Sequence, residues 1–189
     1  MTGLMLIDEL VSELNKLFEH DLLNSKSGEL RRIKVFAQYL PQPKGLVVKP
    51  KGEAAIEYQD FAPADFEDNF PCVIVKLGEI QDSNEGALNQ AQADINLLIG
   101  AYDKTPDNQG WRDVLNIIDK VRTHLQNVRY LAKKFRLEPE MHAYLFDDQP
   151  LPVFFGVIET CWDLPRPLER RNFESGNLSE FPTGSKLLR

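Results

Sequence analysis

The chain has 189 residues, of which 22 are Lys or Arg and 29 are Asp or Glu, so its formal net charge is −7. This length allows one domain, or two at most, with a core large enough to fold without disulfides or metals. Hydrophobic residues make up 42% of the chain and charged residues 27%, values typical of globular domains rather than of disordered chains or membrane proteins. The acidic balance disfavours sequence-independent nucleic-acid binding, which depends on Lys and Arg contacting phosphates.

Two cysteines, Cys72 and Cys161, are too few for a disulfide framework and lack the spacing of metal ligands. Both lie in apolar, strand-like stretches, so we expect two buried thiols. The N-terminus carries Asp8, Glu9 and Glu13 where a signal peptide is basic and then purely apolar. We therefore expect a protein that is made and assembled in a reducing cytoplasm.

The first predicted element is a helix. From Ile7 to Phe18 the apolar residues recur three and four positions apart, the rhythm of an amphipathic helix, which we expect to end between Asn24 and Gly28. From Arg31 to Tyr39 the pattern changes to an alternation with period two, which predicts a strand. Its dry face would hold Ile33, Val35, Ala37 and Tyr39.

A long connecting segment follows between Pro41 and Pro71. It contains five prolines and two glycines, and proline cannot donate to a sheet ladder. Segments this long inside a compact domain are usually functional or disordered. Phe61, Phe66 and Phe70 indicate that part of it docks onto an apolar surface, either of its own domain or of a neighbouring chain.

The middle of the chain predicts a long antiparallel hairpin. Its first strand, Cys72 to Gln81, begins apolar on both faces and should therefore be central in a sheet. A turn at Asp82 to Gly86 leads into a second strand, in which every other residue from Ala91 to Ala101 is apolar. Gln92, Asp94 and Asn96 face the other side.

A second helix is predicted after the polar loop Asp103 to Asn108. Asp107 or Asn108 is available as its N-cap, and Asp113 lies in the first turn, where the helix dipole favours an anion. The predicted buried stripe consists of Trp111, Val114, Leu115, Ile118, Val121, Leu125 and Val128.

Two further strands, Glu140 to Phe146 and Val153 to Trp162, complete the predicted domain. The fold class is therefore α+β, with a mostly antiparallel or mixed sheet of about five strands flanked by two main helices. We expect one domain over residues 1–163 and an extended C-terminal arm over residues 164–189. The arm holds five basic and three acidic residues, so the body carries −9.

No catalytic set is apparent in the sequence. His20, His124 and His142 lack partners at metal-ligand spacing, and the chain contains no nucleophile elbow, P-loop or dinucleotide fingerprint. The pairs Asp147-Asp148 and Glu138/Glu140 lie in a turn and beside a proline. We therefore expect a protein that is not an enzyme and needs no cofactor or metal.

In the block FPCVIVKLGEIQDSNEGALNQAQADINLLIGAYDKTPDNQGWRDVLNIIDKVRTHL, residues 70–125, a Pro-led strand, a hairpin, an alternating strand and a helix follow one another. In this pattern the sequence resembles tail terminator and head–tail joining proteins of long-tailed bacteriophages. The closing strand PVFFGVIETCWDLP and the Leu-rich opening helix agree with the same pattern. The 41–71 segment and the arm have no counterpart in it.

The resemblance implies a small α+β structural subunit of the virion, located in the tail–neck region and assembled in the host cytoplasm. Its copies would form a homo-hexameric ring that caps the tail-tube protein and offers a docking surface to the head–tail connector or head-completion protein. DNA would pass through the ring without specific binding, and no membrane would be involved. A ring interface is heterologous, so each subunit needs two different complementary patches.

Three regions are predicted to make these contacts: the hairpin tip, the loop before the second helix and the arm. The residues are Asp82, Ser83, Asn84, Glu85, Asp103, Lys104, Asp107, Asn108, Pro165, Pro167, Phe173, Phe181 and Leu187. A solvated loop or a disordered tail is the alternative interpretation of each region.

Other functions remain open on the sequence. The nearest alternative is another neck component, either a head-completion or a connector protein. A small-molecule-binding or hydrolytic α+β domain would need convergent polar residues beneath the 41–71 segment. A nucleic-acid module is disfavoured by the acidic balance.

Overall fold

The computed structural model describes residues 2–41, 67–83 and 90–165. This part of the chain forms two helices, α1 (Thr2–Leu17) and α3 (Gly110–Val128). It also forms eight strands: β1 (Leu22–Asn24), β2 (Leu30–Arg32), β3 (Lys34–Ala37), β4 (Cys72–Ser83), β5 (Gln90–Tyr102), β6 (Tyr130–Leu131), β7 (Phe135–Leu145) and β8 (Val153–Leu164).

Six of the strands form one mixed sheet in the order β3-β4-β5-β8-β7-β6, and β1 pairs with β2 in a separate ribbon. Within the large sheet β3 runs parallel to β4, whereas every other neighbouring pair is antiparallel. The α+β class with a mixed sheet is therefore confirmed.

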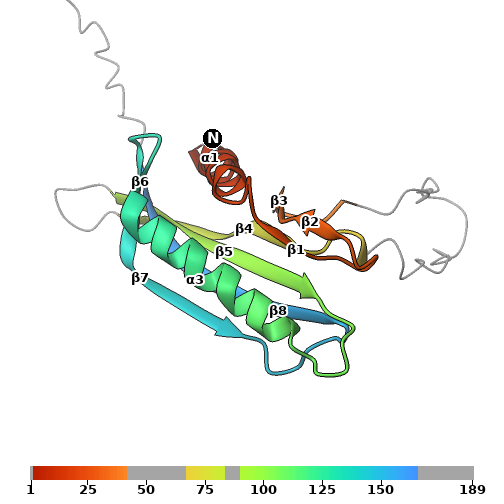
Figure 1. Ribbon diagram of the computed structural model, residues 1–189. Helices are drawn as coiled ribbons and strands as arrows, with labels where there is room; N and C mark the ends of the chain where they lie inside the picture. The colour runs from red at the N-terminus through yellow and green to blue at the C-terminus, as the bar shows by residue number, and fades with distance from the viewer. Residues whose placement is uncertain (1, 42–66, 84–89, 166–189) are drawn as a thin grey trace, which may run out of the picture.

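Both helices pack against the same face of the large sheet (Figure 1). Helix α1 lies over β3 and β4, and α3 lies over β5, β8 and β7. The apolar side chains at every second position of the strands form the sheet side of this core, since side chains two residues apart share a face. On β5 the buried residues of this face are Ala91, Ala93, Ile95, Leu97, Ile99 and Ala101, as the sequence predicted.

Two polar contacts join α3 to α1 and to the residues that follow α1. Nε2 of His124 on α3 lies 3.0 Å from Oε1 of Glu13 on α1. The ammonium group of Lys120 on α3 pairs with the carboxylate of Asp21, which follows α1. His124 is therefore a half-buried bridge between helices and not an isolated surface residue. Neither described helix is long and apolar enough to cross a membrane.

Helix α1 ends at Leu17, earlier than the sequence predicted. Residues 18–20 form a turn, and the chain then enters β1, which pairs with β2 through Leu23 and Arg31. The helical rhythm extends to Phe18, which is buried, but the following residues pair as a hairpin instead of continuing the helix.

The predicted strand from Arg31 to Tyr39 is wrong as a single element. It divides at Ile33 into β2 and β3, which belong to different sheets. Ile33 is buried as expected, but Tyr39 is 76% exposed. Phe36 contributes instead to a small cluster on the other face of the large sheet. An alternation with period two predicts which side chains share a face of a strand. It does not predict that the two halves of a stretch pair in different sheets.

The predicted hairpin is confirmed as β4 and β5, and β4 is central at its start, since Cys72 to Val75 are buried on both faces. The register shifts between Leu77 and Ile80, where the strand contains an irregularity. The turn residues 84–89 lie outside the described residues.

The buried stripe of α3 agrees with the prediction at Val114, Ile118, Val121 and Leu125, whereas Leu115 and Val128 are only partly buried. Ile117 is buried, whereas Trp111 is 37% exposed. The N-cap is Gln109, whose side chain makes no capping hydrogen bond, so the predicted caps Asp107 and Asn108 are wrong. Asp113 has a raised pKa because burial and the nearby carboxylate of Asp103 disfavour its charge.

The last strands are longer than predicted. Strand β7 begins at Phe135 and includes Pro139, with a register shift against β8 between Leu137 and Met141. Strand β8 extends to Leu164, one residue beyond the expected end of the domain. The two-residue strand β6, which the sequence did not predict, pairs with the start of β7.

A buried hydroxyl fixes β8 against β5 and provides a stability test. Thr160 donates a hydrogen bond to the carbonyl of Ile95 at 2.9 Å and accepts one from the indole N–H of Trp162 at 2.9 Å. Both Thr160 and Trp162 are buried. Thr160→Val should cost about 1–3 kcal/mol of unfolding free energy, because the indole N–H loses its acceptor. Urea unfolding measures this, and Thr123→Val on the exposed side of α3 should change stability by less than about 0.5 kcal/mol.

Candidate interaction surface

The face of the large sheet opposite α1 and α3, here called the open face, has no helix of the described chain packed on it. The residues that alternate with the core positions point to this side. Towards one end of the strands they are polar and acidic, and towards the other end they are aromatic and aliphatic. The two halves are described separately below.

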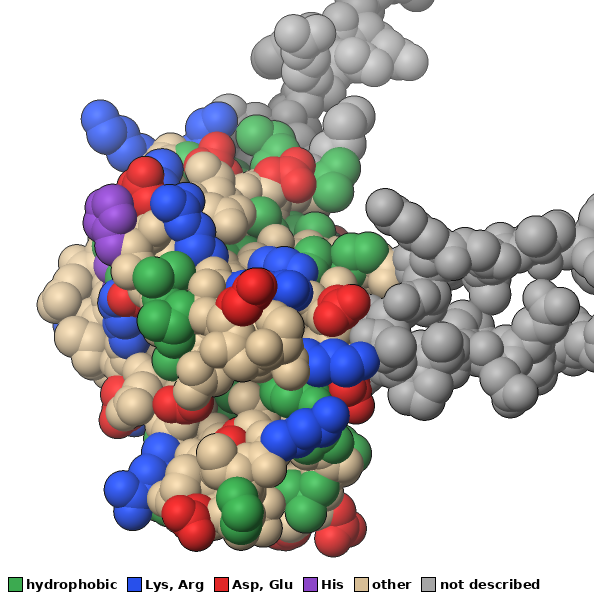
Figure 2. Space-filling view, turned by 45° about the vertical axis from the view of Figure 1, so that its right-hand side comes forward, with side chains coloured by type: hydrophobic (Ala, Val, Ile, Leu, Met, Phe, Trp, Pro, Cys, Tyr) green, Lys and Arg blue, Asp and Glu red, His purple; other side chains and the backbone are tan. Residues whose placement is uncertain are grey.

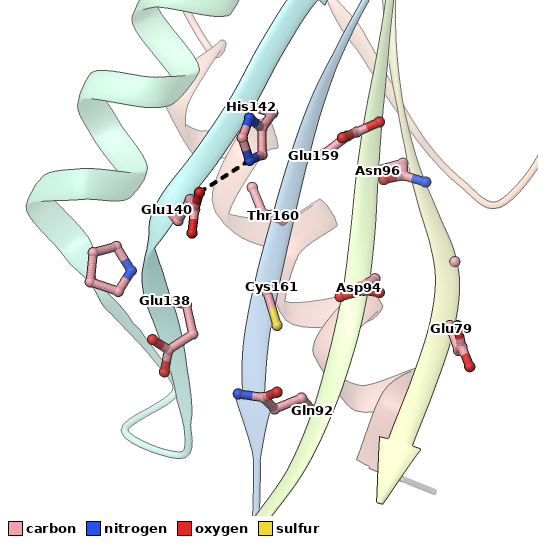
Figure 3. A pocket seen from close by; sticks show the side chains of 12 residues that line it. Glu79, Gln92, Asp94, Asn96, Glu138, Glu140, His142, Glu159, Thr160 and Cys161 are labelled. Atoms are coloured by element: carbon pink, nitrogen blue, oxygen red, sulfur yellow. Dashed lines mark ion pairs between the residues drawn. The ribbon is translucent and has the colours of Figure 1, made fainter.

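The polar half contains a hollow of about 960 Å³, which we call the acidic hollow. Four neighbouring strands, β4, β5, β8 and β7, contribute its walls (Figure 3). Its carboxylates are Glu79, Asp94, Glu138, Glu140 and Glu159. The sequence placed Asp94 on the polar side of its strand, but the gathering of all five depends on the order of the strands in the sheet.

One side of the acidic hollow is bordered by an ion-pair cluster. Arg136 Nη2 lies 2.6 Å from Asp163 Oδ2 and 2.7 Å from Glu138 Oε1. Gln92 Nε2 also donates to Asp163 Oδ1 at 3.2 Å. Burial raises the pKa of Asp163, but the hydrogen bonds from Gln92 and Arg136 outweigh it and hold this pKa below its usual value.

The lowered pKa of Asp163 predicts a pH dependence of stability. Ionised Asp163 stabilises the folded state fully above the unfolded pKa of about 3.9. This contribution is lost as the pH falls from that value through the lower folded pKa. Asp163→Asn should therefore lower stability at pH 6 and make the acid loss shallower, as measured by urea midpoints from about pH 6 to pH 2.5. Asp119→Asn, at an exposed i,i+3 pair on α3, should leave the profile unchanged.

Cys161 lines the acidic hollow and is only partly buried, so the prediction of two buried thiols is right for Cys72 alone. Burial and the negative charge of Asp94 raise the pKa of Cys161 to about 11. Burial likewise raises the pKa of Cys72 to about 12. Both thiols are therefore protonated at neutral pH and lack the lowered pKa of a nucleophilic cysteine.

The other half of the open face carries a row of aromatic rings. Phe70 is fully buried and meets Phe155 edge-on, with ring centroids 5.6 Å apart. The ring centroids of Phe155 and Phe146 are 6.4 Å apart, and those of Phe146 and Tyr144 are 6.2 Å apart. The row therefore runs from a buried anchor to rings at the surface, where Phe146 is 38% and Tyr144 48% exposed.

This half also shows where the 41–71 segment meets the sheet. Residues 42–66, including Phe61 and Phe66, lie outside the described residues. Phe70 lies in the small cluster of the open face with Ile74, Tyr102 and Val153. The expectation that the segment docks onto an apolar surface of its own domain is thus met at Phe70.

The two loops predicted to make contacts lie at opposite ends of β5 (Figure 1). Asp82 is exposed near the end of β4, and Ser83 is the last residue of that strand. Asn84 and Glu85 lie outside the described residues. The thirteen residues of β5 span about 40 Å, so one partner surface would have to be that long to meet both loops.

Asp103 stabilises its own loop. Its carboxylate accepts hydrogen bonds from the backbone N–H of Thr105 at 2.8 Å and from the hydroxyl of Thr105 at 2.9 Å. Burial raises the pKa of Asp103, but these bonds and those from the backbone of Gln109 and Gly110 lower it overall. Asp103 thereby holds the loop that leads into α3.

The remaining loop residues are exposed. Lys104 lies over the ring of Tyr102, with its ammonium nitrogen 5.4 Å from the ring centroid. Asp107 and Asn108 face solvent, and Asn108 adopts a φ of 49°. These residues are accessible to a partner, unlike the half-buried Asp103.

The arm leaves the domain at the same end of the sheet as the β4–β5 turn, because Leu164 pairs with Ala91. Pro165 is exposed. The other predicted contact residues of the arm, Pro167, Phe173, Phe181 and Leu187, lie outside the described residues. The end of β4 and the root of the arm therefore lie at the same end of the sheet, which the sequence did not predict.

Sequence reasoning missed the acidic hollow. A signal was present, since Glu138, Glu140 and His142 recur every second residue, but the predicted strand began only at Glu140 and left Glu138 and Pro139 outside it. In the structure these residues belong to β7, and His142 Nε2 lies 3.4 Å from Glu140 Oε1 (Figure 3). His20 is exposed after α1.

The surface elsewhere mixes charges of both signs with apolar side chains, as Figure 2 shows for one face.

In residues 2–41, 67–83 and 90–165, no group of three or more His, Cys, Asp or Glu side chains is arranged to hold a metal ion. No protein-family model and no curated protein matched the chain in our comparisons.

Proposed function

We propose that this chain is a structural assembly protein of a long-tailed phage, a tail terminator whose copies form a ring on the tail tube and offer a docking surface to the head connector. The observation that carries the proposal is the one-sided covering of the sheet. Both helices pack on one face, whereas the open face keeps exposed aromatic rings beside a concentrated set of carboxylates. Such surfaces are typical of interaction sites.

Two strand edges also support self-association. Strand β3 pairs with residues 72–75 of β4, and β6 pairs with residues 135 and 136 of β7. Within the described chain, the outer edges of β4 beyond Val75 and of β7 beyond Leu137 have no strand partner. Unpaired edges attract further strands unless they are protected. Pro139 and the register shift beside it protect part of the β7 edge, which leaves residues 141–145 available.

These two edges lie on opposite sides of the sheet, so they are different surfaces. A head-to-tail contact between two different surfaces gives a ring when its rotation closes, and an open filament when it does not. The acidic body agrees with a ring that lets DNA pass, because phosphate binding needs clustered Lys and Arg.

The oligomeric state tests the proposal. Light scattering of the purified full-length chain should give a mass several times that of the 21.6 kDa monomer, and electron micrographs should show closed rings. A monomer at high concentration would refute the proposal. Pull-downs then distinguish the two neck functions: a terminator retains purified tail-tube protein, whereas a head-completion or connector component retains portal-complex protein instead.

A further inference from the structure

The acidic hollow carries negative charge that its lining does not balance. Among the described residues, no Lys or Arg lines it, and its one basic side chain is the imidazole of His142. Glu138 pairs with Arg136 at the border. Glu79, Asp94, Glu140 and Glu159 make no ion pair with a Lys or Arg of the described chain. Neighbouring carboxylates repel each other, so this hollow favours a cationic occupant.

The same chain contains a segment of the required charge. Residues 166–171 read RPLERR, with three arginines and one glutamate, whereas residues 172–189 hold equal numbers of basic and acidic residues. The positive charge of the arm is thus concentrated at its start. Arginine suits a hollow of this kind, since its planar guanidinium can bind a carboxylate through two parallel hydrogen bonds.

The position of the arm relative to the hollow narrows the choice of occupant. Cys161 lines the hollow, and β8 ends three residues later at Leu164, about 10 Å along the strand. To enter its own hollow, the arm would have to reverse direction at once. Pro165 and Pro167 oppose this, because a proline restricts the residue before it to extended conformations.

We propose that the acidic hollow on the open face is the docking site for the basic segment 166–171 of a second copy of this chain. This inference rests on the proposed self-association, and the contact between the hollow and segment 166–171 would hold neighbouring copies together. Residues 166–189 can extend over about 80 Å, which is ample to reach a neighbouring sheet. Each copy would donate an arm to one neighbour and accept an arm from the other, the heterologous arrangement that a ring requires.

Site-specific photo-crosslinking in the full-length chain tests this contact. The photoreactive residue p-benzoylphenylalanine replaces Glu140, whose side chain is 83% exposed at the hollow. After irradiation we expect a covalent dimer on a denaturing gel, with mass spectrometry mapping the second end of the cross-link to residues 166–171. The matched control places the same residue at Gln126, which is exposed on α3 on the other side of the sheet, and should give no cross-link to this segment.

Charge variants then test the chemistry of the contact. Arg166→Glu, Arg170→Glu and Arg171→Glu together should lower the dimer yield at least about fivefold, as should raising NaCl from about 50 to 500 mM, because salt screens exposed charges. Lys186→Glu with Arg189→Glu changes the charge of the arm outside 166–171 and should leave the yield unchanged.

The outcomes separate this inference from the proposed function. An oligomer of the expected mass whose cross-links map elsewhere overturns the inference and leaves the ring intact. A cross-link to residues 166–171 that stays within one chain also overturns it. A monomer in light scattering refutes the proposed function itself.

Discussion

Phe70→Ala should lower the free energy of unfolding by about 3–5 kcal/mol, the range for emptying a fully buried aromatic site. The ring of Phe70 fills the space above Gly100, where an added Cβ would lie 2.4 Å from its Cε1 atom. It also meets Phe155 edge-on. Because neither neighbour can collapse into the space without distorting β5 or β8, most of the cavity would persist.

Urea unfolding followed by circular dichroism measures this loss. The matched control is Phe146→Ala, since Phe146 belongs to the same aromatic row but is 38% exposed. It should cost roughly 1 kcal/mol or less, the value of an aromatic contact at the surface. A loss for Phe70→Ala as small as that expected for Phe146→Ala would contradict the anchoring role of Phe70.

Removal of residues 166–189 should convert the proposed ring into monomers, the largest change expected in the assembled state. The two described hydrophobic clusters end at Leu164, so the shortened chain keeps its core. If each copy holds its neighbour through the arm, deletion removes one half of every interface at once. Light scattering at matched concentrations measures the mass of each form.

Two controls accompany the deletion. The thermal midpoint of the shortened chain should match that of the intact chain within a few degrees, extrapolated to infinite dilution so that assembly does not contribute. Deleting residues 181–189 alone should preserve the oligomer, because the basic segment 166–171 remains. An unchanged mass after removal of residues 166–189 would exclude the arm from the interface and leave the strand edges of β4 and β7 to form it.

The elements that were predicted well have patterns that are local in the chain. The alternation from Ala91 to Ala101 identified β5 and its buried face, because successive side chains of a strand point to opposite sides. The short polar turn after β4 predicted that β4 pairs with the next strand, β5, in the antiparallel direction. The helical rhythm identified α1 and most of α3 for the same reason.

The elements that were predicted badly depend on partners distant in the sequence. The stretch 31–39 looks like one strand, but its halves pair with β1 and β4, some ten and forty residues away. Trp111 fits the apolar rhythm of α3, yet it is partly exposed and carries Arg112 over its ring at 5.2 Å. The periodicity of a sequence predicts which face of a helix or strand a side chain lies on. Whether that side chain is buried depends on which other element packs against that face.

The sequence by itself determined the α+β class, the central hairpin, the two amphipathic helices and the unequal charge of body and arm, because each follows from composition or from a pattern within one segment. Only the tertiary structure decided that both helices cover one face and that β4, β5, β8 and β7 bring five carboxylates into one hollow. Strand order is set by contacts between distant segments whose energies add up only in the folded sheet. The open face, on which the proposed assembly depends, is a product of that order.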